Sequence, residues 1–180
     1  MADVSVRPAR PQDAERIARV QLETWRAAYA DVLPPDALAL PEEQVAAVWL
    51  HAVEAPAHRQ RVLVALERDD LVGFLASTPA QDEDLDPVRT TEVTALLVLP
   101  GSGRRGHGSR LLAAAVQDWQ ADGVETAVAW TWDVDAASRS FLQAAGWEGD
   151  GLVRGLEAGT QVQRQLRLHV DVRPAPEGGA

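Results

Sequence analysis

The stretch EVTALLVLPGSGRRGHGSRLL, residues 92–112, decides the fold of this chain. Its first part is an apolar, strand-like run that ends at Pro100. A loop rich in glycine and arginine follows, and an amphipathic helix pattern begins directly after Gly108. Glycines let the backbone approach a ligand closely, and the free N–H groups at a helix N-terminus attract anions. The stretch therefore predicts a strand, a phosphate-binding loop and a helix.

Other interpretations of this loop stay open, because a plain connection between a strand and a helix also uses glycine and arginine. A Walker loop is excluded, since no Gly-Lys-Ser or Gly-Lys-Thr follows. Gly101, Gly103 and Gly106 have the spacing of a dinucleotide-binding fingerprint, but the first strand of that fold normally lies much nearer the N-terminus. The loop alone does not decide between a phosphate site and a plain connection.

Three blocks of the sequence share a pattern with one family. A strand ending Val98-Leu99-Pro100 precedes GRRGHG (103–108), residues 135–147 read DAASRSFLQAAGW, and WRAAY (25–29) ends the first expected helix. These blocks closely resemble the GNAT superfamily of N-acetyltransferases. Its acyl-coenzyme A loop is Gln/Arg-x-x-Gly-x-Gly/Ala, and its later block is Asn-x-x-Ala-x-x-Phe-Tyr-x-x-x-Gly-Phe. The resemblance spans residues 4–168.

Several positions depart from the family pattern. Gly103 stands where glutamine or arginine is usual, which makes the neighbouring Arg104 the candidate for that contact. Asp135 replaces the asparagine and Ser138 replaces the alanine. Leu142 stands at the position of the tyrosine that protonates the departing thiolate in the family. The usual general acid is therefore missing.

The resemblance implies that coenzyme A, as the co-substrate acetyl-coenzyme A, contacts the strand, the loop and the block after it. In the family, the strand backbone pairs with pantetheine and the loop binds the pyrophosphate. The corresponding residues are Leu96, Leu97, Val98, Gly103, Arg104, Arg105, Gly106, His107, Gly108, Ser109, Asp135 and Phe141. His107 is expected to donate to phosphate or to face solvent. No metal is expected, because the histidines form no metal-ligand spacing.

The resemblance also implies transfer of the acetyl group to a primary amine by direct attack in a ternary complex. Glu92 begins the strand where the family often has a catalytic glutamate, with a plain surface carboxylate as the alternative. Ser138 and Tyr29 are candidate proton donors, unless the thiolate leaves without a dedicated acid. Trp25 and Tyr29, with Trp132 as a further candidate, are expected to bind the acceptor. The core is expected to contain Trp119, Trp130 and Trp147.

The rest of the chain predicts the elements of an α/β domain. Strands are expected at 4–7, 61–66, 71–76, 92–99, 126–132 and 161–169, and helices at 11–29, 38–53, after 108 and up to 145. Residues 149–159 are turn-rich, and the acidic loop 81–86 is either a solvated connection or a lip over the acceptor site. The order βααβββαβαββ and the resemblance predict a single GNAT-like domain at 1–172, with a mixed central sheet of about seven strands flanked by about four helices. Residues 173–180 are expected to be a disordered tail.

Composition and charge restrict the function further. A net charge of −10 argues against a nucleic-acid or anionic-membrane surface. The longest apolar run is far shorter than the ~20 residues that a membrane span needs. The chain has no cysteine, which excludes disulfides and thiol catalysis and is compatible with the cytoplasm, the expected location. The expected partner is a small-molecule or peptide amine, and a homodimer is left open.

Three functions are to be distinguished. The first is an active N-acetyltransferase. The second is a non-catalytic acyl-coenzyme A-binding or regulatory module, suggested by Leu142 at the acid position and by Gly103 in the loop. The third is a partner-binding protein that keeps the fold for dimerisation.

Overall fold

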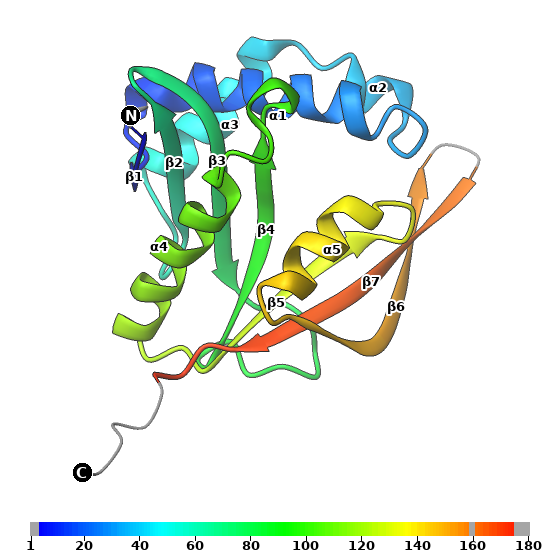
Figure 1. Ribbon diagram of the computed structural model, residues 1–180. Helices are drawn as coiled ribbons and strands as arrows, with labels where there is room; N and C mark the ends of the chain where they lie inside the picture. Colours follow the sequence, from blue (N-terminus) through cyan, green and yellow to red (C-terminus); the bar gives the residue numbers. More distant parts are fainter. Residues whose placement is uncertain (1–3, 159–160, 175–180) are drawn as a thin grey trace.

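Seven strands of the described residues form one mixed sheet in the order β1-β2-β3-β4-β5-β7-β6 (Figure 1). This computed structural model describes residues 4–158 and 161–174. The strands are β1 (Val4–Pro8), β2 (Arg61–Glu67), β3 (Asp70–Pro79), β4 (Thr90–Val98), β5 (Thr126–Trp132), β6 (Glu148–Ala158) and β7 (Gln161–Asp171). All neighbouring pairs are antiparallel except β4 and β5, which run parallel.

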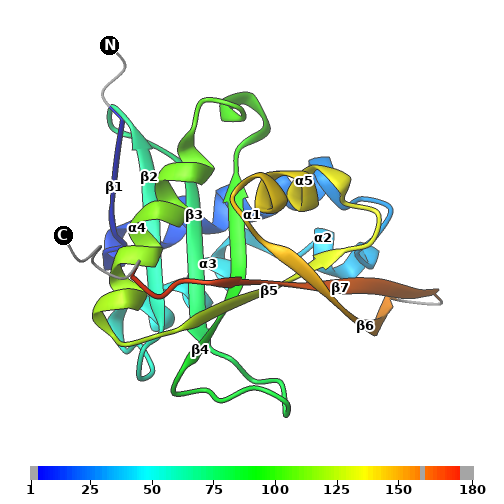
Figure 2. The same ribbon diagram turned by 60° about the horizontal axis from the view of Figure 1, so that its bottom comes forward.

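Helices cover both faces of this sheet. The described residues form α1 (Ala14–Ala28), α2 (Pro35–Leu38), α3 (Glu42–Glu54), α4 (His107–Ala121) and α5 (Ala136–Ala144). In Figure 2, α1 and α4 lie on opposite sides of β2, β3 and β4. One apolar core packs α4 and α5 against the sheet through Leu111, Trp119 and Leu142. A second core packs α1 against the other face through Ile17 and Val20.

The two parallel strands separate soon after they begin. They pair only from Thr90 to Val93 on β4, and β5 then continues along β7 alone. At this point β4 carries an extra residue, Thr94, because the register against β3 shifts between Ala76 and Ser77. A β-bulge of this kind bends the strand and increases its twist. The bulge therefore explains why β4 and β5 diverge, as Figure 1 shows.

The predicted α/β class, the seven-stranded mixed sheet and the flanking helices are confirmed. Two local predictions need correction. The helix expected at 38–53 is present as α3 but begins only after Pro41, because Leu38 ends the short helix α2. The turn-rich segment 149–159 is largely strand β6, whose irregular start contains Gly151 at φ +85°. Residues 175–180 of the expected tail lie outside the described residues. Among the helices of the described residues, none is long and apolar enough to span a membrane.

Candidate active site

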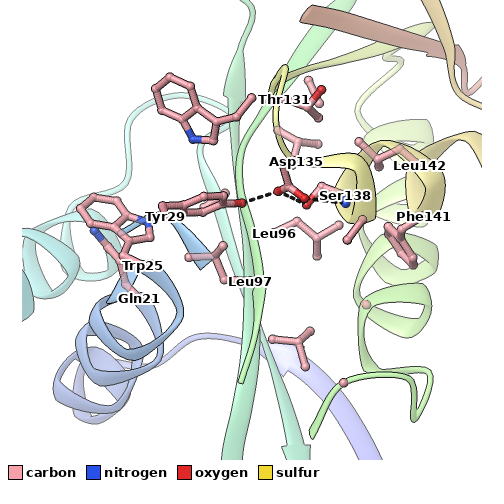
Figure 3. Close-up of a pocket in the computed structure, with 18 of the residues that line it drawn as sticks. Gln21, Trp25, Tyr29, Leu96, Leu97, Thr131, Asp135, Ser138, Phe141 and Leu142 are labelled. Atoms are coloured by element: carbon pink, nitrogen blue, oxygen red, sulfur yellow. Dashed lines mark hydrogen bonds between the residues drawn. The ribbon is translucent and has the colours of Figure 1, made fainter. Parts of the chain in front are cut away.

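A cavity of about 930 Å³ lies at the slot between β4 and β5. Its lining comes from both faces of the sheet. Figure 3 shows Gln21 and Trp25 of α1, with Tyr29 directly after the helix, on one side of β4, and Phe141 and Leu142 of α5 on the other. The slot therefore connects two half-cavities. We call them the loop half, next to residues 102–109, and the aromatic half, next to α1.

The loop half presents a row of free backbone donors. Every backbone N–H from Arg104 to Ser109 lacks a hydrogen-bond partner among the residues that the structure describes. Gly106, the residue before α4, has φ +80°, and Arg104 has φ +57°. These left-handed conformations turn successive N–H groups toward one point, at the positive end of the α4 dipole. The loop can therefore bind an anion such as a phosphate group.

Glycine is required at position 108 for a different reason, which is packing against α5. A Cβ atom at this position would lie 3.2 Å from Cζ of Phe141, which is tighter than an ordinary contact. Glycine therefore allows the start of α4 to pack against α5.

One predicted loop residue, Arg105, is engaged elsewhere, and another, His107, is buried. Nη1 of Arg105 lies 2.9 and 3.1 Å from the two carboxylate oxygens of Glu67, and Arg105 is not among the residues that line the cavity. His107 lines the cavity but is only 1% exposed, so it does not face solvent. Within the described residues neither of its ring nitrogens has a hydrogen-bond partner, and Nε2 lies 3.5 Å from Glu67. The Arg105 side chain therefore holds the loop on the end of β2, and the His107 ring lies buried near the same carboxylate.

A hydrogen-bonded group crosses the slot (Figure 3). The Tyr29 hydroxyl donates to Oδ2 of Asp135 over 2.7 Å, and the Ser138 hydroxyl donates to the same oxygen over 2.6 Å. The backbone N–H of Ser138 donates to Oδ1, so Asp135 also caps α5. The structure thus brings together the two candidate proton donors, although they come from α1 and α5.

The charges of this group follow from burial and hydrogen bonding. Burial raises the pKa of the Tyr29 hydroxyl, and the neighbouring Asp135 carboxylate raises it further. Burial opposes ionisation of Asp135, but hydrogen bonds from Ser138 and Tyr29 outweigh this effect and lower the pKa of the carboxyl. Near neutral pH, Asp135 is therefore an anion held by three donors, and both hydroxyls keep their protons.

Glu92 lies beside the cavity and not in its lining. It is half-buried on the face that α1 covers, opposite Val128 of β5. Burial raises the pKa of Glu92, Asp82 adds to the rise, and Arg154 and Arg167 oppose it. A carboxylate with a raised pKa is a stronger base, which suits the predicted role, but any contact with a molecule in the cavity would pass through water.

Two carboxylates of the acidic loop before β4 are paired with a buried arginine, although most residues of the loop are exposed. Arg167 of β7, which is 5% exposed, pairs with Asp82 at 3.0 Å, with Asp84 at 2.6 Å and with Asp150 at 2.6 Å. The Trp130 indole N–H also donates to Asp82. A buried arginine with several carboxylate partners is held in one position, so the loop is fixed against β7.

The aromatic half contains more residues than the sequence indicated. Trp25 and Tyr29 line it as expected, and so does Trp132. Trp49 and Trp130 line it as well, so Trp130 is not in the core, whereas Trp119 and Trp147 are buried there. Trp130 and Trp132 alternate along β5 and thus share a face, but alternation does not reveal whether a face is covered. Among the described residues, no group of three or more His, Cys, Asp or Glu could hold a metal ion.

The family model of the GNAT acetyltransferases matches residues 19–147, which include the slot, the loop and α5. The chain belongs to this family. Among curated protein sequences none matches it.

Solved structures of GNAT proteins share the fold. A putative acetyltransferase of the GNAT family from Desulfovibrio desulfuricans is 23% identical, with a TM-score of 0.69 over 94% of this chain and 99% of that one. The PaiA N-acetyltransferase from Thermoplasma acidophilum, in complex with coenzyme A, is 14% identical, with a TM-score of 0.73 over 94% and 99%. The putative acetyltransferase yncA from Salmonella typhimurium, with its cofactor acetyl-CoA, is 17% identical, with a TM-score of 0.74 over 99% and 100%.

Proposed function

We propose that this GNAT protein transfers an acetyl group from acetyl-coenzyme A to a primary amine of a small molecule or a peptide, by direct attack in a ternary complex. The observation that carries the proposal is the slot between β4 and β5. It joins a half-cavity with free backbone N–H groups to a second half-cavity lined by side chains. A donor molecule and an acceptor can thus reach the same point from opposite faces of the sheet.

The loop half suits the anionic part of the donor. The N–H groups from Arg104 to Ser109 and the N-terminus of α4 would bind the phosphates, and Arg104 would add its positive charge. The edge of β4 after Val93 has no strand beside it on the β5 side. Its free backbone groups, at Leu96–Val98, would pair with the amides of pantetheine and donate to the thioester carbonyl. Acetyl-coenzyme A supplies the activated acyl group.

The amine needs a base before it can attack, because an alkylamine with a pKa near 10 is mostly protonated at neutral pH. We propose Glu92 for this role, acting through water. Its half-burial and its place on the acceptor side of β4 support the assignment. Holding both reactants in the slot lowers the barrier further, since positioning alone contributes up to ~7–11 kcal/mol in ideal cases.

No side chain is proposed as an essential acid for the departing thiolate. Leu142 is 5% exposed within the core that packs α5 on the sheet. The hydroxyls of Tyr29 and Ser138 already donate to Asp135, so neither hydrogen is free for the thiolate. An alkyl thiol with a pKa of about 8.5 gives a fairly good leaving group without help.

The alternative function is a non-catalytic acyl-coenzyme A-binding module, and it is favoured by the same absence of a free acid. Two measurements separate the candidates. Calorimetry with coenzyme A tests binding, and thiol release from acetyl-coenzyme A with a panel of primary amines tests transfer. Amine-dependent release supports the enzyme, whereas binding without release from any amine supports the module. No binding contradicts both and leaves the partner-binding protein. A cytoplasmic location is part of the first proposal.

A further inference from the structure

The aromatic half of the cavity is the surface that an acceptor would meet. Five aromatic side chains line it: Trp25, Tyr29, Trp49, Trp130 and Trp132. They come from α1, α3 and β5. Trp25, Tyr29 and Trp49 also pack on the apolar core under α1, which holds them in place.

Most polar atoms of these side chains are already bonded within the protein. The Trp49 indole N–H donates to Oε1 of Gln21 over 2.7 Å, and the Trp130 indole N–H donates to Asp82 over 3.0 Å. The Tyr29 hydroxyl donates to Asp135. Within the described residues, the indole N–H groups of Trp25 and Trp132 have no such partner. The half-cavity therefore offers large aromatic surfaces and few free donors.

Charged side chains are scarce in this lining. Of the residues around the whole cavity, Arg104, His107 and Asp135 are the ones besides Tyr29 that carry an ionisable group. Arg104 and His107 belong to the loop half. Asp135 lies in the slot, where Tyr29 and Ser138 already donate to it.

Just outside the lining, Glu92 lies beside the cavity and Arg154 lies 4.3 Å from the centroid of the Trp130 ring, and these two opposite charges act on each other. A second ammonium group or a carboxylate on the acceptor would therefore lose hydration in the aromatic half without meeting an unpaired opposite charge in its lining.

We infer that the acceptor is a primary amine carried on an uncharged aromatic body that packs among these tryptophans. The inference rests on the proposed function and names the substrate class of the same site. Indole rings favour flat aromatic partners through offset and edge-to-face contacts. The free N–H groups of Trp25 and Trp132 can donate to one polar atom on such a body. The surface of a tryptophan also attracts cations, so a polyamine is the rival occupant that the experiment has to exclude.

The experiment compares kcat/KM for thiol release across a matched set of amines. 2-Phenylethylamine and tryptamine carry an uncharged aromatic body, and 2-cyclohexylethylamine has a similar size without aromaticity. Spermidine adds positive charge, and phenylalanine adds a carboxylate to the aromatic amine. We expect the two aromatic amines to exceed each of the other three by at least tenfold. Equal or better kcat/KM for spermidine or phenylalanine overturns the uncharged requirement, and equality for 2-cyclohexylethylamine overturns the aromatic one.

Two variants link the preference to the cavity. Trp132→Phe keeps an aromatic ring and loses the indole N–H, whereas Trp132→Leu loses both. We expect kcat/KM for 2-phenylethylamine to fall in the order wild type, Trp132→Phe, Trp132→Leu, with about tenfold between the first and the last and mainly through KM. The affinity for coenzyme A should not change. Trp25→Leu is the second test if Trp132→Leu does not fold, and an unchanged KM in the folded leucine variant contradicts the inference.

The failure of this inference is distinguishable from that of the proposed function. Binding of coenzyme A without acetylation of any amine in the set and of a wider amine panel overturns both. Acetylation that favours charged amines, or a peptide with a free N-terminal amine, overturns the aromatic acceptor alone and leaves the acetyltransferase intact.

Discussion

The two halves of the cavity are built in different ways. The donors of the loop half come from one continuous stretch, residues 104–109, and they are backbone N–H groups. The aromatic half is assembled from α1, α3, β5 and β7, and it works through side chains. The first can be recognised in any sequence that keeps the glycines and the start of the helix. The second depends on which side chains the fold brings together.

This difference has a functional consequence. Backbone donors bind the same group in every protein that keeps the loop, so the loop half suits a shared co-substrate. Side chains vary freely around a fixed slot, so the aromatic half can differ between proteins of one fold. Changes on the aromatic side should therefore alter turnover or acceptor choice, and changes on the loop side should alter the affinity for coenzyme A.

The largest effect is expected for Glu92→Gln on the acceptor side. The variant keeps the size of the side chain and removes the base, so kcat should fall by about 10²-fold, the lower end of the usual range for general bases. Because burial raises the pKa of Glu92, the wild-type rate should decline as the pH falls toward that pKa, and the variant should lack this decline. Steady-state rates between pH 6 and 9 test this.

The control separates catalysis from folding. Glu43 is an exposed carboxylate on α3, and Glu43→Gln should leave kcat unchanged. The fold disfavours the ionised form of Glu92, so Glu92→Gln should not lower Tm at pH 7, and coenzyme A should bind with wild-type affinity. A wild-type kcat across this pH range would make Glu92 a structural residue.

A smaller effect, on affinity alone, is expected for Gly106→Val in the loop half. Valine disfavours φ +80°, so the N–H groups of the loop would turn away from their common point. Losing one hydrogen bond to a charged group costs about 1.5–3 kcal/mol, which corresponds to roughly 10- to 100-fold in affinity for coenzyme A. Calorimetry on the folded variant measures it.

Gly123→Val is the matched control. Gly123 has φ +75° at the other end of α4, with open space around its Cα. Both variants should lose a similar ~1–2 kcal/mol of stability, but only Gly106→Val should weaken binding. Equal affinities for coenzyme A in the two variants would contradict the role of the loop. Gly108→Val is a poorer test, because its side chain would collide with the packed ring of Phe141, whereas a Cβ atom at Gly106 would meet the flexible end of the Arg110 side chain.

The same division explains what the sequence could predict. The strand, the loop and α4 follow from local pattern, since Pro100, the glycines and the apolar spacing of the helix all lie within residues 92–112. Strand β6 could not be predicted, because its glycines favour turns and its pairing with β7 decides the structure. The break between α2 and α3 was readable, since Pro41 disfavours a continuous helix.

The contacts within the site were even harder to predict from the sequence than the strands and helices. Tyr29 and Asp135 are far apart in the sequence, and no spacing rule predicts that a hydrogen bond joins them across the slot. The place of Trp130 also depends on residues far along the chain, because its indole N–H donates to Asp82 and Arg154 lies over its ring. The link between Arg167 and the acidic loop likewise requires the folded register of β7.

The smallest effects are expected where the two halves meet, at Tyr29 and Ser138. Each hydroxyl donates to Asp135, and burial raises the pKa of Tyr29, so both act as neutral donors to a carboxylate near neutral pH. Tyr29→Phe and Ser138→Ala should therefore each lower kcat by less than about tenfold, or roughly 1.4 kcal/mol. Tyr29→Phe leaves the cap of α5 intact, because the backbone N–H of Ser138 still donates to Asp135.

Steady-state kinetics with the best amine, together with the affinity for coenzyme A, test whether Tyr29 or Ser138 protonates the thiolate. If one of these hydroxyls protonated the thiolate, its removal would cost the ~10²–10⁴-fold that a positioned acid contributes. A loss near a thousandfold in either folded variant, at unchanged affinity, would show that this residue has taken over the role of the missing tyrosine at Leu142. The hydrogen bonds to Asp135 would then have to break in the ternary complex. With losses below tenfold in both, the thiolate leaves without a dedicated acid, and the slot acts by bringing the contents of its two halves together.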